Sequence, residues 1–215
     1  MAQGEFSGEP STLWLTEEGA QDRRMKLIEP FWFRDPDGKQ WDAPAGSVID
    51  GASIPRELWT IVGSPYTGDY RRASIVHDLA CADADGDEDK RRAADRMFFQ
   101  ACRAGGCSIW QSTVLYVGVR IGAAVPEVTA WQAAAAYDSA GPRIRRSGAE
   151  LQLEHDFTAV AERVLAAGET DDAVEVEKRT DRAMSELAGV KQTARPAGSK
   201  RARRRTRRPK RGRDR

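Results

Sequence analysis

The first part of the chain contains short runs in which apolar and polar residues alternate, a pattern typical of β-strands. We predict a strand over residues 25–34 and return strands over residues 39–42 and 47–50. The Asp-Pro-Asp-Gly sequence at residues 35–38 predicts a tight turn, because proline presets φ and glycine tolerates positive φ. These segments predict a small antiparallel sheet. Residues 1–24 are polar and contain glycine, and we expect them to form a flexible lead-in.

In the middle of the chain, apolar residues recur three and four positions apart, which predicts α-helices. We expect helices over residues 70–82 and 88–103, an antiparallel pair joined by an acidic loop. A third helix is expected to begin after Ser108, its N-cap, and to run to about residue 124. A short helix from Pro55 to Ile61 is expected to precede the pair. The buried face of the third helix is expected to consist of Trp110, Val114, Val117 and Ile121.

Together these elements predict an α+β fold, a small antiparallel sheet packed by three helices. A helical extension and a disordered basic C-terminal tail are expected to follow. We place the core domain at residues 25–124, after the lead-in of residues 1–24. The acidic helical extension is placed at residues 125–192 and the tail at residues 193–215. A core of this length is ordinary for a single small domain.

Charge is distributed unevenly along the chain. The 34 Lys and Arg residues nearly balance the 33 Asp and Glu residues, for a net charge of +1. Eleven of the basic residues and one acid lie in residues 200–215, which leaves a net charge of −9 on the rest of the chain. So basic a segment, with almost no apolar side chains, is expected to be disordered when free and to bind phosphate backbones without sequence preference. The cations expected to contact nucleic acid are Arg203, Arg204, Arg205, Arg207, Arg208, Lys210 and Arg211.

Two other partners of the tail stay open: the acidic residues 149–190 of the same chain, and an anionic membrane surface. No transmembrane insertion is expected, because the longest apolar stretch, residues 114–125, contains Arg120 and is too short to span a bilayer. The N-terminus shows no pattern of a secretory signal. We therefore expect reduced thiols at the three cysteines, Cys81, Cys102 and Cys107.

The residues with most chemical potential lie on the predicted helix pair. If the two helices are antiparallel, Asp95 can accept a hydrogen bond from one ring nitrogen of His77. That bond would fix the tautomer and leave the other nitrogen as a general base. The alternative is structural, with a core histidine satisfied by a carbonyl and with Asp95 paired to Arg72 or Arg91. Buried polar groups need partners in any fold, so pairing alone does not indicate catalysis.

A set of ordered motifs runs through the central part of the chain. It consists of Gly51-Ala52-Ser53-Ile54-Pro55-Arg56, Trp59, Gly63-Ser64-Pro65, Arg72 to Asp78, Ala94-Asp95-Arg96 with Phe98, and Trp110 to Arg120. This set, over about residues 25–124, resembles a bacteriophage and prophage family, the domain of unknown function 1353. The resemblance implies a phage or prophage origin, the cytoplasm of the bacterial host or the virion as location, and phage structural proteins as candidate partners. It implies no activity. Gly51 stands where that family has an aromatic residue, and Cys81 where it often has tyrosine.

The helix pair is also similar to the core of secreted phospholipases A2, in which a His-Asp pair on one helix faces an aspartate on its partner. That likeness implies that His77 activates water, that Asp95 orients His77, and that Asp78 and Asp50 help to hold Ca²⁺. The glycine-rich calcium loop and the disulfides of those enzymes are missing from this sequence. The residues expected to contact substrate or to support the site are Ser53, Trp59, Arg72 and Tyr70.

Three other sites have weaker sequence patterns. Ser53 with His77 and an aspartate lacks the nucleophile-elbow pattern of a serine hydrolase. The acidic loop of residues 83–89 lacks the glycine and the glutamate that an EF-hand loop requires. His77 and Cys81 share a helix face, as zinc ligands can, but the other two cysteines have the wrong spacing. We therefore interpret the cysteines as small core residues.

Two functions stay open. The first is a phage-encoded hydrolase in which His77 and Asp95 act on an ester such as a phospholipid, with Ca²⁺ as a candidate cofactor. The second is a non-catalytic virion-associated or assembly protein, in which the same residues lock the helix packing and the basic tail binds nucleic acid.

Overall fold

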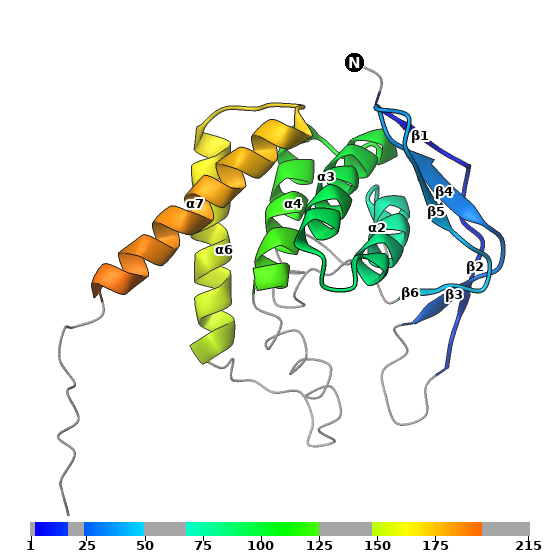
Figure 1. Ribbon diagram of the computed structural model, residues 1–215, viewed down its shortest axis with the longest axis horizontal. Helices are drawn as coiled ribbons and strands as arrows, with labels where there is room; N and C mark the ends of the chain where they lie inside the picture. Colours follow the sequence, from blue (N-terminus) through cyan, green and yellow to red (C-terminus); the bar gives the residue numbers. More distant parts are fainter. Residues whose placement is uncertain (1–2, 17–23, 50–67, 125–147, 195–215) are drawn as a thin grey trace, which may run out of the picture.

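The computed structural model describes residues 3–16, 24–49, 68–124 and 148–194, and the chain has an α+β fold (Figure 1). The strands lie on one side of the molecule, and helices α2, α3, α4, α6 and α7 follow one another across it (Figure 1). The predicted fold class is therefore confirmed. The predicted helix at residues 55–61 and the chain from residue 195 onward lie outside the described residues.

Within these ranges the strands form two three-stranded antiparallel sheets. The first has the order β1 (Glu5–Phe6), β4 (Phe31–Arg34) and β5 (Gln40–Ala43). The second has the order β2 (Thr12–Trp14), β3 (Met25–Leu27) and β6 (Val48–Ile49). Alternate residues face the core, as the two-residue period of a strand requires. The buried strand residues are Met25, Leu27, Phe31, Phe33, Ala43 and Ile49.

Two predictions for this region are wrong. The predicted strand over residues 25–34 is two strands in different sheets, because the chain bends at residues 28–29 and Pro30 has no N–H to donate to a ladder. The predicted lead-in contributes strands β1 and β2. Phe6 explains part of this difference, because its ring packs 4.8 Å from the ring of buried Phe33 and so ties β1 to the sheet.

The turn predicted at residues 35–38 is confirmed. Gly38 donates its N–H to the carbonyl oxygen of Asp35 at 3.0 Å and has a φ of +87°, which glycine tolerates best. The Asp35 carboxylate also accepts from the N–H of Lys39 and from Nε1 of Trp41, both at 2.9 Å. One buried carboxylate therefore fixes the turn and the first residues of β5.

Helices α2 (Arg71–Ala84), α3 (Glu88–Gly105) and α4 (Ile109–Ala124) begin and end close to the predicted limits. The Asp87 side chain accepts from the N–H groups of Asp89 and Lys90 and so caps α3. Gly106 ends α3 with a φ of +109°. The predicted cap of α4 is confirmed, since Ser108 Oγ accepts from the N–H of Gln111 at 3.1 Å.

The buried face predicted for α4 is correct except at its start. Trp110 is 50% exposed, whereas Val114, Val117 and Ile121 are buried. The first turn of α4 lies at the surface, and continuous burial begins at Ser112. From there to Gly122 the helix is buried on all sides, because α3 covers one face and α6 and α7 cover the other.

The predicted acidic extension forms two helices, α6 (Gly148–Ala166) and α7 (Ala173–Ala194). Helix α6 packs against α4, and α7 crosses α6 and reaches α3 (Figure 1). The apolar residues of α6, such as Phe157 and Val160, belong to the same hydrophobic cluster as Phe33 and Phe98. One continuous core therefore runs from the sheets to the C-terminal helices.

Candidate functional site

The centre of the candidate site is the contact between His77 on α2 and Asp95 on α3. These two helices pack closely along their lengths, and the predicted meeting of the two side chains is present. His77 Nε2 lies 2.8 Å from Asp95 Oδ1, and both side chains are 0% exposed. The Phe98 ring lies against the imidazole, with 4.6 Å between the ring centroids. The dyad is thus held rigidly between the helices and is sealed from solvent.

Asp95 has two further cationic partners. Arg91, one turn earlier on α3, donates from Nε to Asp95 Oδ1 at 3.3 Å. Arg120, on α4, donates from Nη1 to Asp95 Oδ2 at 3.3 Å. Burial alone would raise the pKa of Asp95, but the hydrogen bond and charge of His77 and the two guanidinium groups lower that pKa below its usual value. The carboxylate is therefore ionised at neutral pH.

Cys81 is the third member of the site, and the sequence interpretation had placed it in the core. It follows His77 by one helical turn, and its Sγ lies 3.3 Å from Nε2 and 3.8 Å from Nδ1 of the imidazole. Burial would lower the pKa of His77, but the Cys81 sulfur and the Asp95 carboxylate raise it to about 10. The spacing of four residues was visible in the sequence and could have indicated this contact.

Cys81 is also the member of the trio that reaches solvent, because it is only partly buried. It lines a cavity of about 430 Å³ between the end of α2, the start of α3 and the end of α4. Arg91 and Arg120 line the same cavity, and Met184 of α7 borders it. The geometry is a thiol at a cavity wall, with an imidazole and a carboxylate behind it and two guanidinium groups beside it.

The same three side chains are a candidate metal-ligand group. One ligand atom from each of His77, Cys81 and Asp95 lies within 4.8 Å of the others. Asp78, predicted as a calcium ligand, is not part of this group. Asp50, the other predicted calcium ligand, lies outside the described residues, as do Ser53 and Trp59. Calcium at this site therefore stays a prediction that the described residues do not test.

The remaining predicted support residues lie on other contacts. Tyr70 is 2% exposed, and burial raises the pKa of its hydroxyl. Arg72 lies 3.4 Å from the Glu9 carboxylate and stacks over the Phe6 ring at 4.7 Å. These contacts join α2 to the N-terminal strands. The seven tail cations predicted to bind nucleic acid lie outside the part of the chain that the structure describes.

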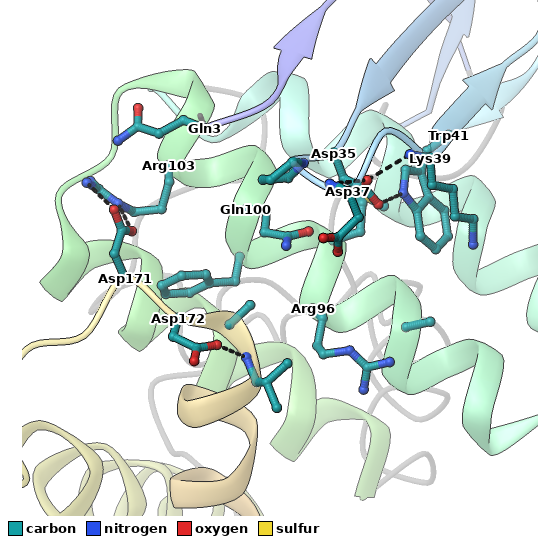
Figure 2. A pocket seen from close by; sticks show the side chains of 16 residues that line it. Gln3, Asp35, Asp37, Lys39, Trp41, Arg96, Gln100, Arg103, Asp171 and Asp172 are labelled. Atoms are coloured by element: carbon teal, nitrogen blue, oxygen red, sulfur yellow. Dashed lines mark hydrogen bonds and ion pairs between the residues drawn. The ribbon is translucent and has the colours of Figure 1, made fainter. Parts of the chain in front are cut away.

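A second cavity, of about 520 Å³, lies between the turn of the first sheet, α3 and the start of α7 (Figure 2). Several of its charged side chains have partners within the protein. Arg103 donates from Nε to Asp171 at 2.7 Å, and the Asp172 side chain accepts from the N–H of Val174 at the start of α7 (Figure 2). Asp35 holds Trp41 as described above. We interpret this cavity as a junction that docks α7 onto α3.

The other two cysteines behave as the sequence predicts. Cys102 and Cys107 are both 0% exposed and belong to the hydrophobic core, and all three cysteines are free thiols. Within the described ranges, no helix is both long enough and apolar enough to cross a membrane.

Two bacterial proteins are similar to part of this chain. Both are from Sinorhizobium fredii (strain NBRC 101917 / NGR234). Uncharacterized protein y4jT is 37% identical over 120 residues, which is 54% of this chain and 33% of that protein. Uncharacterized protein y4iH is 31% identical over 99 residues, which is 46% of this chain and 40% of that protein. The chain thus spans between a third and two fifths of the length of these relatives.

No solved structure matches the chain. Neither relative's name mentions a phage, so the phage origin stays a prediction, and so does the likeness to phospholipase A2. The segment that contains His77, Cys81, Arg91 and Asp95 does match a known family. Residues 25–119 match the family described as protein of unknown function (DUF1353).

Proposed function

We propose that the segment matched by the family contains the site of a hydrolase that cleaves an ester, with His77 and Asp95 as the pair that handles the proton. The observation that carries this proposal is the 2.8 Å contact between His77 Nε2 and Asp95 Oδ1. It fixes one ring nitrogen, and within the described residues the hydrogen-bond contact of Nδ1 is to the Cys81 sulfur at 3.8 Å. Because the ring is sealed from solvent, Nδ1 is left to exchange a proton on the Cys81 side of the site.

The protonation state supports a role as general acid. With its pKa raised to about 10, the His77 ring is an imidazolium at neutral pH. An imidazolium can give a proton to the oxygen of a leaving alcohol, and it then becomes the base for the next step. Asp95 acts as a positioning residue, since it holds the ring and stabilises the charge that the ring carries. Both groups are sealed, so substrate must reach them through the partly buried Cys81 side of the site.

Calcium is part of this proposal as a cofactor that Asp78 and Asp50 would help to hold. Ca²⁺ would stabilise the oxyanion that forms during ester hydrolysis. A phospholipid is the corresponding substrate class. The support for both is the likeness of the helix pair to phospholipases A2, and the assay below is arranged to test each of them separately.

The test is hydrolysis of a fluorogenic carboxylic ester and of a fluorescent phospholipid by the full chain, with Ca²⁺ and then with a chelator. We expect His77→Gln to lower kcat/KM by about 100-fold to 10,000-fold. The control is His155→Gln, because His155 is exposed on α6. Equal activity in the His77→Gln and His155→Gln variants, or no hydrolysis of either substrate by the unaltered chain, would overturn the proposal. Hydrolysis that continues in the presence of the chelator would exclude calcium as a cofactor and leave the rest of the proposal unchanged.

A second candidate is a non-catalytic virion-associated or assembly protein with a nucleic-acid-binding tail. Eleven cations in residues 200–215 favour it, because such a segment releases counterions from phosphate backbones. Retention of the chain on DNA or heparin is expected to collapse as salt is raised, and deletion of residues 200–215 is expected to abolish retention at low salt. Unchanged retention after the deletion would exclude the tail as the binding element.

A further inference from the structure

The cavity at the end of α2 brings a thiol and two guanidinium groups together. Cys81 lines it from α2, Arg91 from α3 and Arg120 from α4. The imidazole of His77 lies directly behind the thiol, with both ring nitrogens within 3.8 Å of the sulfur. A histidine in contact with a thiol is the arrangement that activates a cysteine as a nucleophile.

Arg120 supplies a second and independent observation. The residue is 8% exposed, and its Nε is buried without a hydrogen-bond partner in the described part of the chain. A buried donor without an acceptor costs free energy. Arg91 is 25% exposed and donates from its side-chain Nε to Asp95. Asp87 and Glu88 line the same cavity, but the Asp87 carboxylate accepts from the first N–H groups of α3 and Glu88 pairs with Arg92. Arg91 and Arg120 are the cations of the lining.

We propose that Cys81 is the nucleophile of this site, and that its substrate is an ester with an anionic group, a carboxylate or a phosphate, placed against Arg91 and Arg120. The inference rests on the proposed function, because it names the nucleophile and the substrate class of the same site. It assigns His77 to proton transfer and Asp95 to holding His77, as above. Cys81 therefore replaces the water molecule that the sequence analysis expects His77 to activate.

The reaction has two steps. In the first, the Cys81 thiolate attacks the ester carbonyl, a C–S bond forms, and the C–O bond to the alcohol breaks. The leaving oxygen takes a proton from the His77 imidazolium, so the products are an alcohol and a thioester on Cys81. In the second step, neutral His77 takes a proton from a water molecule that attacks the thioester. The C–S bond breaks, the carboxylic acid leaves, and the thiolate and imidazolium are restored.

A metal ion held by the same trio is the competing interpretation. Charge disfavours it, because the carboxylate that would bind the metal already has Arg91 and Arg120 within 3.3 Å. A divalent cation at this place would lie beside two fixed positive charges. The thiolate interpretation needs no third cation, since a thiolate and an imidazolium together are neutral.

The first experiment measures alkylation of Cys81 by iodoacetate and by iodoacetamide in the full chain, with mass spectrometry of the Cys81 peptide. Cys102 and Cys107, which are fully buried, are the internal controls. We expect Cys81 to react about tenfold faster than a free thiol at the same pH, because the adjacent His77 ring activates the sulfur. Relative to a free thiol, iodoacetate is expected to gain about threefold over iodoacetamide, because the reagent is an anion.

Matched variants assign these effects to residues. His77→Gln is expected to remove this gain in reactivity. Arg91→Gln is expected to remove the preference for iodoacetate, whereas Lys90→Gln, which removes the same charge from an exposed neighbour on α3, is expected to keep it. A Cys81 that reacts like an ordinary thiol, with no anion preference, would overturn the inference. So would a reactivity that emerges only after a chelator is added, because a metal would then have covered the sulfur.

The second experiment separates this inference from the proposed function. The Cys81→Ser variant is assayed on the same esters as the unaltered chain. In the unaltered chain, an acyl group on Cys81 is detected by mass spectrometry and identified as a thioester by its removal with hydroxylamine. Loss of hydrolysis in Cys81→Ser with an acyl group on Cys81 supports both proposals. Hydrolysis that persists in Cys81→Ser would overturn the nucleophile and leave the hydrolase standing. A reactive, anion-preferring Cys81 in a chain without any ester hydrolysis would overturn the proposed function instead, and the thiol assignment would then hold for electrophiles other than esters.

Discussion

Arg120 Nη2 donates to Asp181 Oδ1 at 2.9 Å, so a guanidinium near the end of α4 connects helix α7 to the candidate site. The other terminal nitrogen of the same guanidinium donates to Asp95. One turn earlier on α7, Glu177 accepts from two arginines of α3. Charge pairs therefore link α7 to both α3 and α4, and the carboxylates that make these pairs are among the acidic residues of the predicted extension.

Glu177 is expected to contribute more to stability than its exposed neighbours on α7. It is 8% exposed and accepts from Arg96 Nη1 at 2.7 Å and from Arg92 Nη1 at 3.3 Å. Glu177→Ala leaves two partly buried guanidinium groups without this partner, and we expect it to lower the free energy of unfolding by about 2–4 kcal/mol. Urea denaturation of the full chain measures the change.

The control for this prediction is Glu186→Ala on the same helix. The Glu186 carboxylate is 56% exposed and lies 3.9 Å from Arg163, so its loss should change the free energy of unfolding by less than about 0.5 kcal/mol. Equal urea midpoints for the two variants would contradict the importance of the Glu177 pairs.

The helix limits were predictable from the sequence because their signals are local. Asp87 and Ser108 cap α3 and α4 through contacts two and three residues away, and Gly106 ends α3 by its own backbone conformation. The strand pairing was not predictable in this way. Glu5 of β1 pairs with Arg34 of β4, which is 29 positions away along the chain. No residue adjacent to Glu5 indicates this pairing.

The candidate site likewise has contacts that the local sequence predicts and contacts that it does not. The His77–Asp95 contact follows from two adjacent antiparallel helices, so the sequence pattern predicted it. The role of Cys81 depends on where the cavity opens, and that is decided by α4 and α7. Arg120 likewise was not assigned to the site from the sequence, because its partner Asp181 is 61 positions away. Packing between elements that are far apart in the sequence therefore determines the cavity and the Arg120 contacts, which the local pattern did not predict.

Two glycines are expected to respond to alanine in opposite directions. Gly106 has a φ of +109°, and Gly106→Ala is expected to cost about 1 kcal/mol because a Cβ disfavours this backbone conformation. Gly189 lies exposed within α7, and a Cβ there meets nothing within 4 Å. Gly189→Ala is expected to raise stability by about 0.5–1 kcal/mol. Thermal denaturation followed by circular dichroism measures both, and a shift of the same sign in the two variants would contradict the assignment.

Asp95 is expected to be the most costly carboxylate to neutralise. It is 0% exposed and compensates His77, Arg91 and Arg120. We expect Asp95→Asn to lower the free energy of unfolding by about 3–5 kcal/mol, because it leaves buried cations without an anion. The control is Asp83→Asn on α2, an exposed residue, with an expected change below about 0.5 kcal/mol. A cost for Asp95→Asn no greater than for the control would show that the three cations do not depend on this carboxylate.

The stability of the chain is expected to depend on pH through His77. The pKa of this histidine rises from 6.5 in the unfolded chain to about 10 in the folded chain, so the folded state binds the proton more tightly. The resulting stabilisation is complete below pH 6.5, declines as the pH rises, and is lost once the pH passes about 10. Asp95 gives the opposite dependence at low pH. Because its pKa is lowered in the folded chain, Asp95 contributes to the free energy of unfolding above pH 3.8, and this contribution is lost as the pH falls further.

The measurement is the urea midpoint at a series of pH values between 6 and 10, where we expect a decline on the order of a few kcal/mol in the free energy of unfolding. His77→Gln removes the titrating group and is expected to flatten this decline. His155→Gln removes an exposed histidine of α6 and should leave the decline unchanged. If His77→Gln keeps the slope of the unaltered chain, the imidazolium between Asp95 and Cys81 is not the source of the pH dependence.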